Sequence, residues 1–325
     1  MPPRPLCRLA LGPALAVLLL AGCATAAPTA APATGAAAPG TRLLEALAHV
    51  ADTDATRSAF EFSDVAALGA LGGGGWAGIR YAGARRISPK LPLEAGLRID
   101  AAGYAISAGR EPRHVIVFAG GQDDATVAAG LRRLGWKPDG DRFLAPPMPM
   151  TPAPPNDGGL VPGGQARSSG GDLLVGGQTA DLADAVPAGR PTLAVRPVIA
   201  ALAACLGDVV AARARFAGPG YLAVAATGVR RPDTAGAKPR AVLCAATGSG
   251  ADAAATAETL RQGFATGRAP TGSVPFTTLY PDATVTVLDG PEHVVRAETT
   301  EEAPDTMLSE FGGYGLPGEV GQGEV

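Results

Sequence analysis

Short apolar runs that end at glycine alternate with amphipathic segments over residues 41–325. His114–Ala119 is an almost continuous apolar run followed by Gly120-Gly121, a pattern typical of a buried strand that ends in a turn. After the turn, Val127, Leu131 and Leu134 recur at helical spacing, so the next segment is predicted to be a helix. The pattern therefore indicates a chain in which strands alternate with helices.

The second half of the chain repeats this pattern. Ala241–Ala246 is again apolar and is bounded by Gly248, and a helix is predicted from near Asp252 to Phe264. Each unit has one strand candidate before this core and two strand candidates plus a helix after it. These are Tyr104–Ser107, Asp141–Leu144, Leu173–Val175 and the helix Thr179–Val186 in the first unit, and Tyr221–Ala225, Thr284–Leu288, His293–Ala297 and the helix Pro304–Phe311 in the second. A chance likeness between two short patterns is the alternative to a true repeat.

The expected fold class is α+β, with two similar β-β-α-β-β-α units, mainly antiparallel sheets and the helices on one face. The first unit is predicted to span residues 41–196. It begins with a helix at Thr41–Val50, continues with a strand at Ser58–Phe62, and carries a long exposed Pro/Gly-rich insertion at residues 148–171. A helix or helix pair at Pro197–Phe216 opens the second unit, 197–325, and a binding cleft is expected between the units.

The N-terminal segment has the features of an export signal. Arg4 and Arg8 precede the apolar stretch Leu9–Leu20, which is shorter than the roughly 20 apolar residues that a membrane-spanning helix needs. The stretch ends in Leu20-Ala21-Gly22-Cys23, and this lipobox resembles that of bacterial lipoproteins. The resemblance implies that residues 1–22 are a signal peptide and that Cys23 is the lipidated first residue of the mature chain, with palmitate among its acyl chains. An ordinary signal peptide, cleaved near Ala24–Ala26, is the alternative.

Composition narrows the classes of protein to consider. Apolar residues make up 46% of the chain, enough for a sizeable core, whereas the Ala/Pro-rich segment 23–40 lacks periodicity and is expected to be a tether. The net charge of −3, without a basic stripe, argues against nucleic acid as a partner. The abundance of Ala, Gly, Pro and Arg, together with the lipobox, resembles uncharacterised lipoproteins of actinobacteria.

Four cysteines are present, and two are accounted for by the leader: Cys7 lies within it and Cys23 is the expected lipid site. For an exported protein, the remaining Cys205 and Cys244 are most simply a disulfide. Two unrelated buried thiols are the alternative, because both lie in apolar surroundings. The absence of a Cys-x-x-Cys motif argues against a redox role.

No residue qualifies as catalytic or metal-binding by its motif. His49, His114 and His293 have no second ligand at zinc spacing, so surface or strand-end positions are expected for them and no metal or cofactor is predicted. Helix starts and turns explain the other candidates, because none completes a phosphate-loop, nucleophile-elbow or calcium-loop motif. These candidates are Gly72–Gly75, Gly120–Asp123, Asp139–Asp141, Gly248–Gly250 and the acidic residues Glu301, Glu302 and Asp305.

These observations favour a lipoprotein anchored to the cell membrane on its extracytoplasmic face. We expect a non-catalytic binding or structural protein of the cell envelope, with an envelope protein or an apolar molecule as its partner. An extracytoplasmic, hydrolase-like enzyme whose site is assembled from scattered residues is the alternative. A pocket lined by converging acids, Ser and His would favour the enzyme, and an apolar groove would favour the binding protein.

Overall fold

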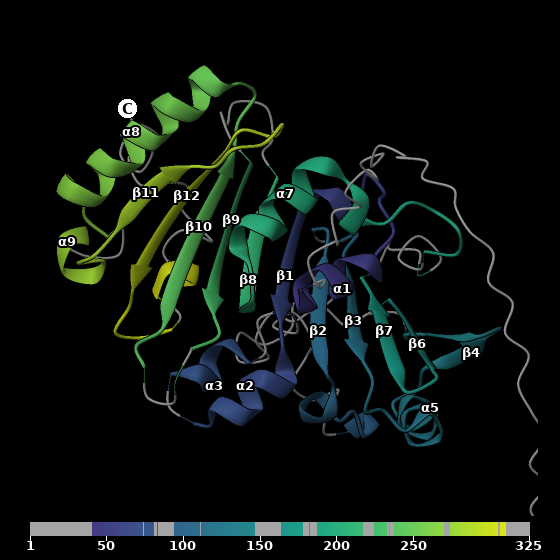
Figure 1. The fold of residues 1–325 in the computed structure, drawn as a ribbon. Helices are drawn as coiled ribbons and strands as arrows, with labels where there is room; N and C mark the ends of the chain where they lie inside the picture. The colour runs from purple at the N-terminus through teal and green to yellow at the C-terminus, as the bar shows by residue number, and fades with distance from the viewer. Residues whose placement is uncertain are drawn as a thin grey trace, which may run out of the picture. The chain divides into compact units, whose positions relative to one another are not determined.

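A single antiparallel β-sheet organises the chain (Figure 1). The computed structural model describes residues 41–73, 75–80, 83, 94–110, 112–146, 164–177, 182, 187–216, 224–232, 234, 237–269, 274–304 and 306–309. Within these ranges, all the strands join one 12-stranded sheet in the order β11-β12-β10-β9-β8-β1-β2-β3-β7-β6-β5-β4. All the described residues belong to one compact unit, Pro39–Val325.

The strands are three to seven residues long, within the usual range for globular proteins. Those of the first half are β1 (Ala59–Ser63), β2 (Tyr104–Ala108), β3 (Val115–Ala119), β4 (Lys137–Asp139), β5 (Arg142–Leu144), β6 (Gln165–Ser169) and β7 (Asp172–Gly176). Those of the second half are β8 (Val209–Arg215), β9 (Val224–Arg230), β10 (Arg240–Ala246), β11 (Thr284–Val287) and β12 (Val294–Thr300).

Helices α1, α2, α5 and α8 begin at side chains that satisfy one of their first backbone N–H groups. Thr41, Asp64, Asp123 and Ser249 each accept a hydrogen bond from the backbone N–H three residues further on. The α-helices are α1 (Arg42–Ala48), α2 (Val65–Leu71), α3 (Trp76–Ile79), α5 (Asp124–Arg133), α7 (Pro197–Leu206), α8 (Gly250–Thr266) and α9 (Phe276–Leu279), and the 3-10 turns are η1 (Thr56–Ser58), η3 (Ile99–Ala101) and η5 (Leu193–Val195). Among the described residues, no helix has both the length and the apolarity that crossing a bilayer requires.

Helices cover both faces of the sheet. We call the face that carries Phe62, Val117 and Cys244 the α7 face, because α1, η5 and α7 pack on it in one hydrophobic cluster. On the opposite α8 face, α5 packs over β3 and β7, while α8 and α9 pack over β10 and β12. Helices α2 and α3 cover β8 and β9 on that same face. The prediction that the helices lie on one face is therefore wrong.

The prediction of two β-β-α-β-β-α units, each with its own sheet, is also wrong. Strand β8, which lies within the predicted helical segment Pro197–Phe216, pairs with β1 and joins both halves into one sheet. Only Pro197–Leu206 of that segment is helical. The expected insertion at 148–171 ends in β6, while residues 147–163 lie outside the described residues.

The two halves nevertheless share one strand order. Counting outward from the centre of the sheet, the first half runs β1-β2-β3-β7-β6 and the second runs β8-β9-β10-β12-β11. Helix α5 follows β3 just as α8 follows β10, and α1 and α7 precede β1 and β8. The hairpin β4–β5 is an addition found in the first half, where it extends the sheet beyond β6.

The ladder between β1 and β8 marks the centre of this arrangement. Its middle pair is Glu61 opposite Arg213, and the Arg213 guanidinium Nε lies 3.3 Å from the Glu61 carboxylate. Both side chains are largely buried on the α8 face. The sheet therefore has opposite charges where equivalent strands of the two halves meet.

Most of the individually predicted elements are confirmed. The helix after Thr41, the strand before Asp64 and the cores of both units form where the periodicity places them. The predicted helix Thr179–Val186 lies outside the described residues except for Leu182. Of the predicted helix Pro304–Phe311, residues 304 and 306–309 are described, and residues 306–309 are helical.

Candidate functional site

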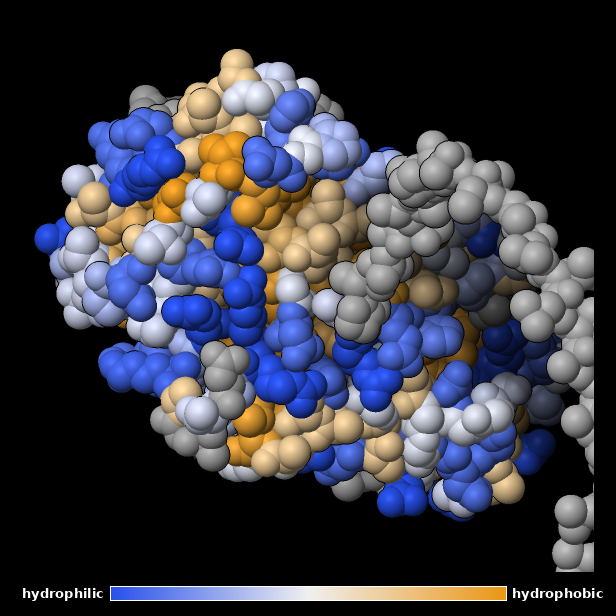
Figure 2. Space-filling view, in the orientation of Figure 1, coloured by the Kyte–Doolittle hydropathy of each residue, from blue (hydrophilic) through white to orange (hydrophobic). Residues whose placement is uncertain are grey.

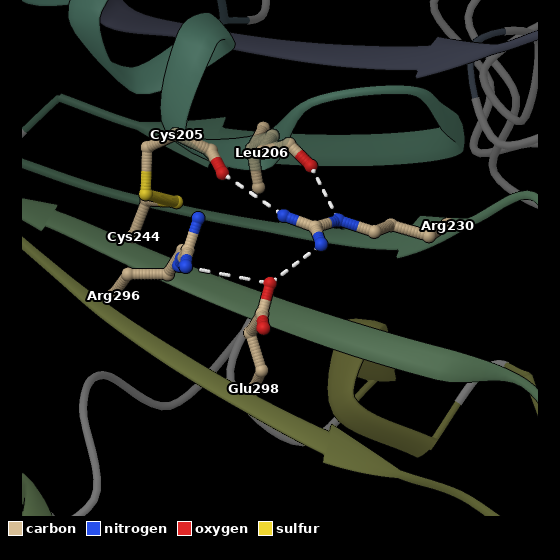
Figure 3. Close-up of a disulfide and its surroundings, with 6 residues drawn as sticks. All are labelled: Cys205, Leu206, Arg230, Cys244, Arg296 and Glu298. Atoms are coloured by element: carbon tan, nitrogen blue, oxygen red, sulfur yellow. Dashed lines mark hydrogen bonds and ion pairs between the residues drawn. A yellow bond between two sulfur atoms is a disulfide. The ribbon is translucent and has the colours of Figure 1, made fainter. Parts of the chain in front are cut away.

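Cys205 and Cys244 form a disulfide, as the sequence predicts (Figure 3). Their Cα atoms are 6.2 Å apart, and the two residues are only 2% and 0% exposed. The bond ties the last turn of α7 to the middle of β10. Because this disulfide is sealed inside the core, its role is structural. The predicted lipid site, Cys23, lies outside the described residues.

An arginine from β9 completes the surroundings of the disulfide (Figure 3). The Arg230 guanidinium donates to the carbonyl of Leu206 at 3.0 Å and to that of Cys205 at 3.4 Å. These carbonyls end α7, where a positive charge also interacts favourably with the helix dipole. Glu298 on β12 lies 2.6 Å from Arg230, and Arg296 lies 3.6 Å from the same carboxylate oxygen. Two guanidinium groups share one carboxylate in this cluster, and Arg230 braces the end of α7 against β9 and β12.

The three histidines are far apart in the sequence and play separate roles. His49 is the exposed C-cap of α1, and His293 stands in the turn directly before β12. His114 directly precedes β3, where it is 2% exposed, so it is a strand-end residue but a buried one. Across the described residues, no three His, Cys, Asp or Glu side chains gather closely enough to hold a metal ion.

Tyr104 and His49 form a polar pair that could resemble a catalytic dyad. The Tyr104 hydroxyl is hydrogen-bonded to Nδ1 of His49, and the Arg42 guanidinium lies 5.7 Å from the centre of the tyrosine ring. Burial raises the pKa of Tyr104 well above its usual value, with a further contribution from the Glu45 carboxylate. The raised pKa favours the protonated phenol, and the hydrogen bond joins the end of α1 to β2.

The acidic and glycine-rich motifs occupy structural positions. Asp123 is the N-cap of α5, and its hydrogen bonds with Thr126 lower the pKa of its carboxyl group. Ser249 is the N-cap of α8, which explains Gly248–Gly250 as a helix start. Asp139 ends β4, and Gly140 and Asp141 form the turn to β5. The carboxylate of Glu301 accepts a hydrogen bond from the backbone N–H of Met307 at 2.7 Å.

A cavity of about 400 Å³ lies at the amino end of α7. Its wall comes from three separate stretches of chain: the loop after α1, the segment that leads into α7, and the turn between β11 and β12. The lining residues are Asp52, Pro191, Val195, Arg196, Pro197, Val198 and Glu292. We call this cavity the α7 groove. It is open to solvent, and it lies where segments of the two halves of the chain meet.

Charged side chains at one side of the α7 groove hold each other in place. The Asp52 carboxylate accepts a hydrogen bond from Nε of Arg57 at 2.5 Å and lies 3.5 Å from Nη1 of Arg196. The backbone N–H of Asp52 donates to the carbonyl of Pro191 at 2.9 Å, which fixes the loop against the segment before η5. These contacts order the charged side chains at the groove.

Part of the lining of the α7 groove is apolar. Val195 is 68% exposed, an unusually large exposure for a valine, and it stands at the end of η5 beside Val198. Val198, Ala201 and Leu288 pack only partly into the core of the α7 face. Figure 2 shows hydrophobic surface running from the ends of β10 and β12 across α7, with hydrophilic side chains bordering it. An apolar wall with an ordered polar margin is typical of a binding site.

Comparisons with protein-family models, with curated proteins and with solved structures find no match to this chain. Sequence reasoning found the disulfide but missed the α7 groove. The groove residues lie in three stretches that carry no common motif, and contacts between distant segments, such as that of Asp52 with Pro191, bring them together. The dipeptide Arg196-Pro197, at the start of an apolar helix, was the one local signal for this region.

Proposed function

We propose that this protein is a lipid-anchored binding protein of the cell envelope that holds an apolar part of its partner in the α7 groove. The observation that carries the proposal is the buried Cys205–Cys244 disulfide. Structural disulfides persist in oxidising compartments and are rare in the cytosol. The disulfide therefore supports export, which is the outcome that the lipobox Leu20–Cys23 encodes.

Lipid at Cys23 would hold the folded unit at the outer face of the membrane. Each buried methylene contributes about 0.8 kcal/mol, so several acyl chains anchor a protein stably where one chain does not. Residues 24–40, rich in Ala and Pro, then act as a spacer between the lipid and the first described helix. In this proposal, the folded unit binds the partner and the N-terminus anchors the protein to the membrane.

The α7 groove suits an apolar group with a polar end. Val195 and Val198 offer apolar surface, and removing such surface from water is worth about 25 cal/mol per Å². Glu292 and Arg196 stand at the border of the groove, where they can orient a polar or charged group of the partner. An exposed segment of an envelope protein or an apolar small molecule meets these requirements.

Phase partitioning tests the anchor. Wild-type protein expressed in a bacterium that processes lipoproteins should enter the detergent phase, whereas Cys23→Ala should move to the aqueous phase. Cys7→Ala is the matched control, because it removes the other cysteine of the leader and should leave partitioning unchanged. An aqueous wild-type protein, or a Cys23→Ala variant that stays with detergent, would remove the lipoprotein proposal.

Binding of the neutral dye Nile red tests the α7 groove independently of the anchor. Val195→Asp should weaken dye binding about three- to tenfold, because it replaces apolar contact with a carboxylate that must be desolvated. Val274→Asp changes another exposed valine, 41% exposed and away from the groove, and should leave binding unchanged. Equal effects of the two substitutions would show that the dye does not report on the groove.

A further inference from the structure

The two edges of the sheet are built differently. Edge strand β4 reads Lys137-Pro138-Asp139, with every residue exposed. Proline lacks a backbone donor, and charged side chains oppose pairing, so this edge is protected against added strands. The other edge strand, β11, reads Thr-Val-Thr-Val, with neither charge nor proline. Val287 of β11 is 43% exposed, one of the few large apolar side chains so exposed among the described residues.

In the first half of the chain, the strand equivalent to β11 has a further strand paired to its outer side. Strand β6 occupies the same place in the order β1-β2-β3-β7-β6 that β11 occupies in β8-β9-β10-β12-β11. On its outer side, β6 pairs with β5 in antiparallel fashion, Phe143 opposite Ala166 and Leu144 opposite Gln165. No described residue pairs with the outer side of β11. The chain thus contains an example of one more antiparallel strand at this position.

Hydrogen bonds show which groups of β11 point outward. The N–H of Leu288 donates to the carbonyl of Val294, so the alternate residues Leu288, Thr286 and Thr284 direct their backbone groups toward β12. The Val285 carbonyl points the other way, since it accepts a hydrogen bond from Nη2 of Arg261 at 3.4 Å. Val285 and Val287 therefore present their backbone donors and acceptors at the outer edge.

From this geometry we propose that β11 pairs with β11 of a second copy of this chain, which extends the sheet across a two-fold axis at Thr286. In this register, Val285 of each copy lies opposite Val287 of the other, and Thr286 faces its own counterpart. Side chains directly opposite each other share a face, so valines meet valines on the α8 face and the threonines meet on the α7 face. The alternation Thr-Val-Thr-Val makes the strand complementary to itself.

Arg261 controls access to this edge. Its guanidinium donates a hydrogen bond to the Val285 carbonyl and also lies 3.3 Å from the Glu258 carboxylate. Pairing requires Arg261 to release the Val285 carbonyl. The hydrogen bond between them is long and exposed, so it is weak. The interface is small compared with the ~1,600 Å² of a standard complex, so we expect a dissociation constant of about 10–100 µM. The lipid anchor of the proposed function would raise the local concentration at the membrane, but the pairing itself does not depend on it.

Sedimentation equilibrium of full-length Cys23→Ala protein tests the dimer without the lipid. The protein should show a monomer–dimer equilibrium. Adding Val287→Lys should weaken the dimer at least about tenfold, because it places two like charges in the joined strands. Adding Val285→Pro should do the same without harming the fold, since the lost N–H points outward. Val274→Lys is the matched control and should leave the equilibrium unchanged.

Two further variants test the register and the role of Arg261. Thr286→Cys should form a disulfide-linked dimer on mild oxidation, because opposing residues at the axis lie about 4.5 Å apart between Cα atoms. Arg261→Ala should strengthen the dimer severalfold. A wild-type chain that stays monomeric at the highest concentration overturns the proposal. So does a dimer that Val287→Lys and Val285→Pro leave intact, because its interface would lie elsewhere.

Discussion

At the scale of single residues, Arg230 links three parts of the second half. It donates to the last carbonyls of α7, forms an ion pair with Glu298 on β12, and is itself part of β9. Buried ion pairs owe their value to complete hydrogen bonding rather than to charge alone, because desolvation offsets much of the attraction. Here the guanidinium meets that requirement with two helix carbonyls and a carboxylate.

Arg230→Ala should lower the free energy of unfolding by about 2–3 kcal/mol, because it leaves the helix carbonyls and the Glu298 carboxylate without their donor. Urea denaturation measures the change. The control is Lys238→Ala, which removes an exposed ion pair with Glu302 and should cost less than about 1 kcal/mol. Equal losses in the two variants would contradict the role given to Arg230.

Local chemistry made several residue-level predictions correct. Side chains of Thr, Asp and Ser predict helix starts, and the two cysteines that remain after the expected leader and lipid site predict a disulfide. Arg230 could not be recognised in this way, because its partners lie 24 and 25 residues away on α7 and still farther away on β12. No local pattern distinguishes it from the many other arginines of this chain.

At the scale of elements, β8 shows why the sequence suggested two sheets. Its residues, Val-Val-Ala-Ala-Arg-Ala-Arg, are buried on both faces over most of their length, so the strand lacks the alternation that marks a half-exposed one. Alanine also favours helices, and the preceding α7 is itself rich in alanine. Gly207, with a φ of 74°, ends α7 and was the available sign of a break.

Gly130, in the middle of α5, shows how closely an element can be packed. A Cβ atom at this position would lie 2.2 Å from the carbonyl oxygen of Ala95. Alanine in place of a helical glycine normally gains up to about 1 kcal/mol. Here the contact is with backbone, which cannot move aside as a flexible side chain can.

Gly130→Ala should therefore destabilise the protein by about 1–3 kcal/mol in thermal or urea unfolding, despite its better helix propensity. Gly69→Ala in α2 is the matched control. Its Cβ would meet only the Arg80 guanidinium, at 3.0 Å, and that side chain can swing away. A stabilised Gly130→Ala variant would show that α5 does not pack on residue 95 as described.

At the scale of the whole molecule, the two halves of the chain share a strand order, and the ladder between β1 and β8 joins them into one sheet. The weak sequence repeat located two cores correctly, yet it could not reveal that β1 and β8 join them. Strands β1 and β8 are far apart in the sequence, and no local pattern of residues shows that their edges pair. The α7 groove is also assembled from distant segments of the chain, so motifs could not predict it either. The ion pair of Glu61 with Arg213 lies in the middle of this junction.

The disulfide contributes to the stability of the whole fold. It spans a sequence separation of 39 residues, so the chain-entropy model predicts about 4 kcal/mol of stabilisation. Cys205→Ala/Cys244→Ala should show this loss in urea denaturation. Wild type should weaken similarly in dithiothreitol, while the double variant should be insensitive to the reductant. A wild-type protein indifferent to reductant, with two thiols open to alkylation after unfolding, would mean that the bond does not form.

The central claim is that the folded unit works outside the cytoplasm on a lipid anchor, and the mass of the mature N-terminus tests it most directly. Protein isolated from membranes of a lipoprotein-processing bacterium should give an N-terminal peptide that begins at Cys23 and carries the added mass of a diacylglyceryl group. Cys23→Ala should give no such peptide. A wild-type chain that retains residues 1–22, or one that begins elsewhere without lipid, would contradict the account.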